Sequence, residues 1–129
     1  MNVEKQIQFW IISAAHDLPV AESLFEQRHY SWCLFIGHLL LEKLLKAFYV
    51  RDNMQMPPRT HDLVKLANTI TLKFDDAQLQ FLSKVNDFNI EARYPDDKLV
   101  FYKICTREFA ESNLHAIKEM YKWLKQEMK

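Results

Sequence analysis

Apolar residues recur every three or four positions along most of this sequence, which is the spacing of helices that bury one face. In residues 3–27 the stripe consists of Ile7, Ile11, Ala14, Leu18, Ala21 and Phe25. Pro19 lies inside this segment and removes one backbone hydrogen bond, so we expect a kink near residues 15–18.

Residues 31–51 are apolar over more than one stripe. A helix of this kind is either central in a bundle or covered by a second subunit. Because one bundle interior should not need so much apolar surface, we expect a homodimer.

Two proline-containing breaks divide the rest of the chain. Pro57 and Pro58 form the first, and Pro95 forms the second, since the residue before a proline is disfavoured in a helix. Further helices are expected at residues 61–71, from 75 or 76 to 92, and 99–127. The pattern predicts an all-α fold, with residues 1–129 forming one domain: a single antiparallel, up-and-down bundle of four to five helices.

Composition narrows the functional classes. Gly37 is the only glycine, which excludes a glycine-rich nucleotide-binding loop. Lys plus Arg and Asp plus Glu both number 17, so no overall field attracts nucleic acid or an anionic membrane. Cys33 and Cys105 have neither a zinc spacing nor a disulfide framework. With no signal peptide or membrane span expected, the predicted location is cytoplasmic, with reduced thiols and no cofactor.

His38, Glu42 and Lys46 are spaced by four residues and therefore lie along one helix face. A His–Glu pair could supply two metal ligands, but no second pair has matching spacing. We therefore predict no metal site. A polar seam on so apolar a helix needs partners, which makes it a candidate cleft floor or subunit contact.

Two further clusters lie at helix boundaries. Around His61, spacing alone favours a simple helix start capped by Thr60, and the alternative is that His61 faces a pocket. Arg93 is either a favourable cation at a helix C-terminus or a fork for phosphate, with the Tyr94 ring stacking a base. On the second interpretation, Arg93→Ala weakens binding and changes stability little.

The order of these clusters resembles the HEPN family (higher eukaryotes and prokaryotes nucleotide-binding domain). The resemblance is carried by residues 13–18, by Glu-Lys-x-x-Lys-Ala at 42–47, by Thr-His-Asp-Leu at 60–63 and by Ala-Arg-Tyr-Pro at 92–95. It implies a four- or five-helix bundle that commonly dimerises and pairs with a minimal nucleotidyltransferase in toxin–antitoxin-like systems. Many family members are metal-independent ribonucleases, with an Arg followed after four to six residues by a His.

This sequence departs from the Arg–His pattern. The positions after Arg93 where the His should fall are Lys, Leu and Val at 98–100, and His115 lies one residue too far from Arg107. We therefore predict a non-catalytic interaction module that pairs with a nucleotidyltransferase, with nucleotide or RNA binding as a further expectation. The alternative is a ribonuclease that uses Arg93 or Arg107 with His115 or His61 as the general base.

The candidate binding residues, for nucleotide or protein partner, are those of the three clusters. They are Arg93, Tyr94, His61, His38, Glu42 and Lys46. No catalytic residue is assigned.

Overall fold

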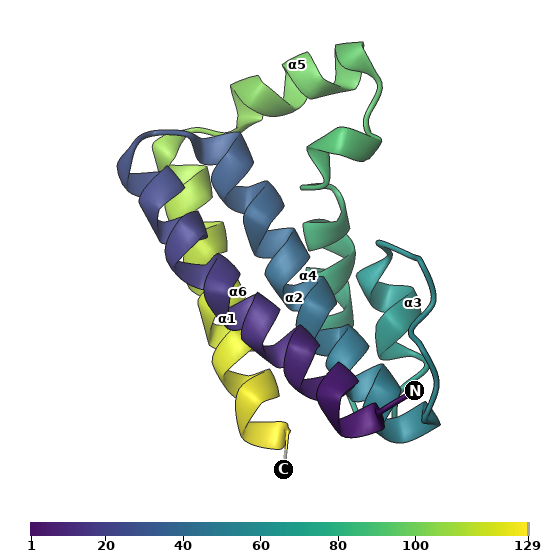
Figure 1. The fold of residues 1–129 in the computed structure, drawn as a ribbon. Coiled ribbons are helices and arrows are strands. Elements are labelled where there is room, and N and C mark those ends of the chain that lie inside the picture. The colour runs from purple at the N-terminus through teal and green to yellow at the C-terminus, as the bar shows by residue number, and fades with distance from the viewer. Residues whose placement is uncertain (129) are drawn as a thin grey trace.

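The computed structural model describes residues 1–128, and within this range every regular element is a helix (Figure 1). The α-helices of this range, in chain order, are α1 (Val3–Glu26), α2 (Tyr30–Asn53), α3 (Leu63–Ala67), α4 (Asp76–Asn86), α5 (Pro95–Ile104) and α6 (Arg107–Glu127). A short 3-10 helix, η1 (Ile90–Ala92), lies between α4 and α5. The predicted all-α class is confirmed over this range.

The helix boundaries differ from the predicted ones for local reasons. The predicted helix at 99–127 is divided, because the α5 C-cap falls at Cys105 and Thr106 then caps α6 by accepting from the Phe109 N–H. This division raises the count over residues 1–128 from the predicted four to five helices to six. Pro95, predicted as a break, is the first residue of α5, since a first helical position needs no N–H. α1 continues through Pro19 as one helix.

The helix predicted at 61–71 is confined to α3. Its N-cap is Asp62, whose carboxylate accepts from the backbone N–H groups of Val64 and Lys65. The predicted capping role of Thr60 is therefore wrong, because the neighbouring acid satisfies the first turn. The helix predicted to reach residue 92 ends instead at Asn86, where α4 stops before η1.

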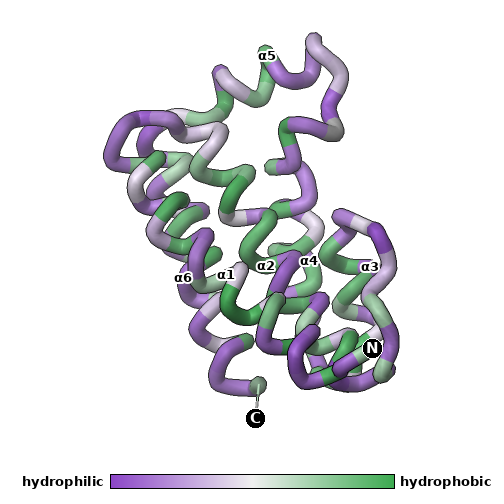
Figure 2. Tube along the Cα trace, viewed as in Figure 1, coloured by the Kyte–Doolittle hydropathy of each residue, from purple (hydrophilic) through white to green (hydrophobic). Residues whose placement is uncertain are grey.

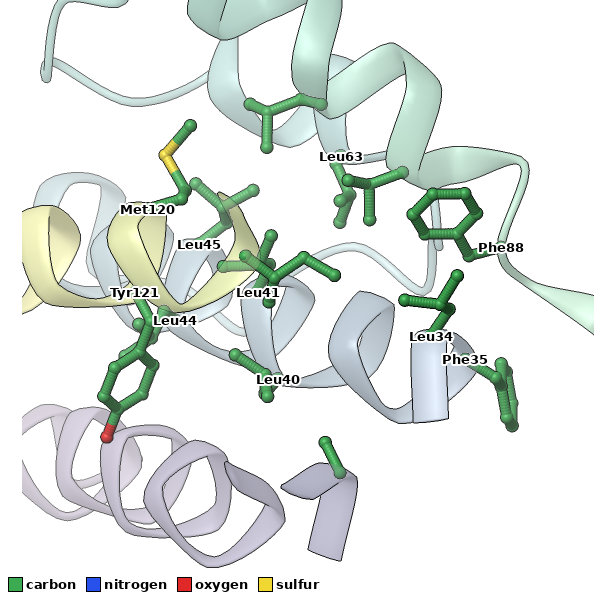
Figure 3. Packing of buried hydrophobic residues seen from close by; sticks show 14 of the residues in the cluster. Leu34, Phe35, Leu40, Leu41, Leu44, Leu45, Leu63, Phe88, Met120 and Tyr121 are labelled. Carbon is green, nitrogen blue, oxygen red and sulfur yellow. The ribbon is translucent and has the colours of Figure 1, made fainter. Parts of the chain in front are cut away.

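α2 forms the centre of the core, with α1, α6, α3 and α4 packed around it (Figures 1 and 3). Its buried apolar side chains include Leu34, Leu40, Leu41, Leu44, Leu45 and Phe48. Gly37 allows α6 to approach closely, because a Cβ at this position would lie 2.7 Å from the Ile117 side chain.

The broad apolar surface of α2 therefore does not call for a second subunit, because its own chain covers it. Among the large apolar side chains of α2, Trp32 is the one left exposed within the described chain, at 45%. The central-helix alternative is confirmed, and the reason given for a homodimer is wrong.

Exposed apolar residues gather elsewhere. α5 lies at one end of the molecule (Figure 1) and carries hydrophobic positions of its own (Figure 2). Leu99, Val100, Tyr102 and Ile104 are exposed, and Phe101 is the buried residue of this helix. Within residues 1–128, no helix is both long and apolar enough to cross a bilayer.

Candidate functional site

The polar seam of α2 lies in the interior and meets the loop that precedes α3. Lys46 Nζ donates to Glu42 Oε2 at 2.9 Å, and His61 Nδ1 lies 2.8 Å from Glu42 Oε1. Glu42 and Lys46 are both more than nine-tenths buried. Because a carboxylate can only accept a hydrogen bond, we place the ring proton of His61 on Nδ1, which donates it to Glu42. One buried carboxylate thus holds a cation on one oxygen and an imidazole on the other.

Lys46 is enclosed from a second side by α1. Its Nζ lies 5.4 Å from the centroid of the Trp10 ring, a cation–π contact. A buried ion pair that is hydrogen-bonded and covered in this way has a fixed geometry. The Glu42 carboxylate is therefore a rigid support for the His61 ring.

His38 supports the same loop through its backbone. It is fully buried, and its Nε2–H donates to the His61 carbonyl oxygen at 2.8 Å. Burial lowers the pKa of His38 below 6.5, because desolvation disfavours the charged ring. Since the unfolded chain binds this proton more readily, the contribution of His38 to stability is lost as the pH falls below about 6.5.

The loop around His61 is also tied to α4. Asn86 Oδ1 accepts from the Leu63 N–H at 2.9 Å, and Asn86 Nδ2 donates to Asp62 Oδ1 at 2.9 Å. His61 is thus fixed by α2 through its ring and carbonyl and by α4 through the residues that follow it.

The His61 ring remains accessible on the side away from Glu42. Its side chain is 64% exposed and lines a cavity of about 440 Å³. The other lining residues in the described chain are Phe35, Leu39, Asn89 and Glu91. A carboxylate-oriented imidazole beside a cavity can accept a hydrogen bond or a proton through Nε2 in its neutral form. The alternative that His61 faces a pocket therefore describes the geometry, although spacing alone favoured a simple helix start.

Arg93 points elsewhere. Its Nε and Nη2 both donate to the backbone oxygen of Asp87, the C-cap of α4, and its guanidinium lies 4.6 Å from the Phe101 ring centroid. Two of the donors that a phosphate fork requires are therefore engaged on a carbonyl. Arg93 joins the end of α4 to α5, which indicates a structural role. Tyr94, by contrast, is 80% exposed at the N-cap of α5.

We expect Arg93→Ala to lower the free energy of unfolding by about 1.5–3 kcal/mol, the range of a charged hydrogen bond. Arg93→Lys is expected to recover only part of this, because an ammonium cannot reproduce the fork and the stacking. Urea denaturation of the three proteins measures both effects. Unchanged stability in both variants would contradict a structural role for Arg93.

Other sequence candidates have more ordinary environments. Arg107 lies 3.8 Å from Glu111 and over the Phe25 ring. His115 borders a depression of about 230 Å³ between α1 and α6, where Lys118 is paired with Glu22 at 2.6 Å. Arg107 is not among the described residues that line this depression, whereas His115 is. The geometry thus gives the Arg107–His115 pair no shared cavity.

The described residues contain no group of three or more His, Cys, Asp or Glu placed to hold a metal ion. His38 Nε2 and both Glu42 oxygens are engaged by protein groups.

The two cysteines are free and buried, and burial raises the pKa of Cys33 to about 12 and that of Cys105 to about 11. Neither thiol is therefore an activated nucleophile.

The HEPN domain family matches residues 7–127, nearly the whole chain. The chain belongs to the HEPN family. Its fold is similar to the crystal structure of TT1696 from Thermus thermophilus, with a TM-score of 0.80 and 18% identity. That likeness covers 99% of this chain and 100% of TT1696, and at this identity it concerns the fold alone. No curated protein matches the chain.

In this HEPN domain, the structure brings together four of the six predicted binding residues: His38, Glu42, Lys46 and His61. Arg93 and Tyr94 are not among the described residues that line the cavity. Sequence reasoning missed the other cavity residues. Phe35 and Leu39 looked like ordinary core positions, and Asn89 and Glu91 carried no motif that distinguished them.

Proposed function

We propose that this HEPN domain is a non-catalytic, cytoplasmic interaction module that forms a homodimer and pairs with a minimal nucleotidyltransferase in a toxin–antitoxin-like system. The observation that supports this proposal is the exposure of apolar side chains on two separate surfaces. Exposed apolar side chains that gather on one surface often mark interaction sites. Two of them suit a module that contacts both a second copy and a different protein.

The first surface is on α5 and consists of Leu99, Val100, Tyr102 and Ile104. This helix lies at one end of the molecule (Figure 1), and its four exposed side chains are accessible to a neighbouring molecule. In a two-fold dimer the same patch is buried on both subunits, so a short helix contributes twice. We assign the homodimer to this α5 surface.

The second surface is on α1 and consists of Phe9, Ile12 and Val20. The N-terminal half of α1 lies at the end of the molecule away from α5 (Figure 1). A depression of about 380 Å³ continues this surface beside Val20, lined by Pro19, Ser23 and Leu24 with His16. We assign the nucleotidyltransferase to this α1 surface.

Paired variants test both assignments. Leu99→Ser with Val100→Ser is expected to convert the dimer into a monomer, measured by light scattering. This variant should still co-purify with a co-expressed minimal nucleotidyltransferase. Phe9→Ser with Ile12→Ser is expected to abolish co-purification and leave the dimer intact. Each pair is the control for the other, and circular dichroism verifies folding. If the wild type is a monomer and does not co-purify, the proposal is overturned.

Nucleotide or RNA binding is part of the proposal through Tyr94. Its exposed ring can stack on a base, a contact that tolerates any base because every base has a π-face. We expect Tyr94→Ala to weaken the binding of a short single-stranded RNA, measured by fluorescence anisotropy. Equal binding by the wild type and the variant would remove Tyr94 from the site.

One observation favours the second candidate, a metal-independent ribonuclease. The Glu42 carboxylate orients His61 beside a cavity, as a general base requires. Incubating the protein with structured and single-stranded RNA, without metal, separates the two functions. The module proposal predicts no cleavage, whereas cleavage that His61→Ala abolishes would establish the ribonuclease.

A further inference from the structure

We propose that the cavity beside His61 takes an arginine side chain from a protein partner. This inference rests on the proposed pairing function for the source of that side chain. The cavity, of about 440 Å³, lies where α2, the loop before α3 and the segment after α4 meet. The chemistry of its lining determines what it can bind.

The polar groups of the lining include two acceptors. His61 uses its Nδ1–H on Glu42, which leaves Nε2 in the neutral ring as an acceptor. Glu91 contributes an exposed carboxylate from η1. A ligand that contacts both groups must donate hydrogen bonds. A guanidinium has five N–H donors in a planar fork and no acceptor, so it matches this arrangement.

Charge around the cavity favours a cation. In the described chain neither Lys nor Arg lines the cavity. The adjoining segment, residues 87–98, contains four acids, Asp87, Glu91, Asp96 and Asp97, and two bases, Arg93 and Lys98. The Arg93 guanidinium donates to the Asp87 carbonyl and does not line the cavity in the described chain. A phosphate would therefore meet an excess of like charges here, because the acids outnumber the bases of this segment.

The apolar part of the cavity fits the remainder of an arginine side chain. Phe35 and Leu39 are one turn apart on α2 and both line the cavity. Arginine buries its methylene stem on apolar surface while its charged head contacts polar groups. Arginine is favoured over lysine because its planar head forms paired hydrogen bonds with a carboxylate and stacks on aromatic faces.

The test is a titration of the full chain with the blocked tripeptide Gly-Arg-Gly, followed by NMR of the His61 ring. The matched probes are Gly-Lys-Gly and Gly-citrulline-Gly, the latter a neutral analogue of the arginine peptide. We expect the arginine peptide to shift the His61 ring signals at millimolar concentration and the citrulline peptide to have little effect. Glu91→Gln should weaken arginine-peptide binding about tenfold, because one charge-assisted contact is lost. Glu119→Gln, on α6, is the charge-matched control and should bind normally.

The proposal is overturned if the arginine peptide leaves His61 unshifted, if citrulline binds equally well, or if Glu91→Gln has no effect. A shift caused instead by inorganic phosphate or a mononucleotide would identify an anion site and also overturn it. This experiment needs no partner protein. If the peptide titration is negative but the chain still pairs with the nucleotidyltransferase, only the proposed arginine site is wrong. If the peptide binds but no pairing occurs, the proposed function is wrong.

Discussion

Glu42→Ala is expected to lower the free energy of unfolding by about 3–5 kcal/mol, the range for breaking a buried ion pair. The substitution removes the carboxylate that accepts from Lys46 at 2.9 Å and from the His61 ring at 2.8 Å. Lys46, whose side chain is 9% exposed, would then be a buried cation without its anion. Urea denaturation at neutral pH measures the loss.

A double substitution separates an unpaired charge from a simple loss of packing. Glu42→Leu combined with Lys46→Met removes both charges and keeps apolar volume, so we expect it to be much more stable than Glu42→Ala. If the double variant is as unstable as Glu42→Ala, the destabilisation does not come from the unpaired ammonium.

Leu41→Ala is expected to lower the free energy of unfolding by about 2–5 kcal/mol. Leu41 is fully buried on α2 in the core shown in Figure 3, so the truncation leaves a cavity as well as removing apolar contacts. Ile12→Ala removes a similar side chain from an exposed position on α1 and should change stability by less than about 0.5 kcal/mol. Thermal or urea unfolding of both variants, without any partner, makes the comparison. Similar losses in the two would contradict the assignment of α2 as the core helix.

The fold could be predicted where periodicity is strong. The stripes of residues 3–27 and 31–51 predicted α1 and α2 to within a few residues. The breadth of the α2 surface was harder to interpret, because a sequence pattern does not say whether the same chain or a second copy covers it. α3 supplies Leu63 to that cover from across the proline-containing loop, and α6, which is distant in sequence from α2, supplies Met120 and Tyr121.

The site was predictable in its parts but not as a whole. Four-residue spacing placed His38, Glu42 and Lys46 on one face of α2. The contact between Glu42 and His61 joins residues 19 apart across a loop, and nothing in the spacing fixes that geometry. Arg93 was misleading for a similar reason. Its fork is occupied by a backbone carbonyl, a partner that no sequence motif reports.

The central claim is that buried Glu42 fixes the His61 ring so that its Nε2 remains available to the cavity. Long-range proton–nitrogen correlation NMR of the neutral ring measures this directly, because protonated and unprotonated ring nitrogens have distinct nitrogen shifts. We predict a protonated Nδ1 and an unprotonated Nε2 in the wild type, with this preference lost in a folded Glu42→Gln variant. A wild-type His61 with its proton on Nε2, or a tautomer that Glu42→Gln leaves unchanged, would contradict the claim.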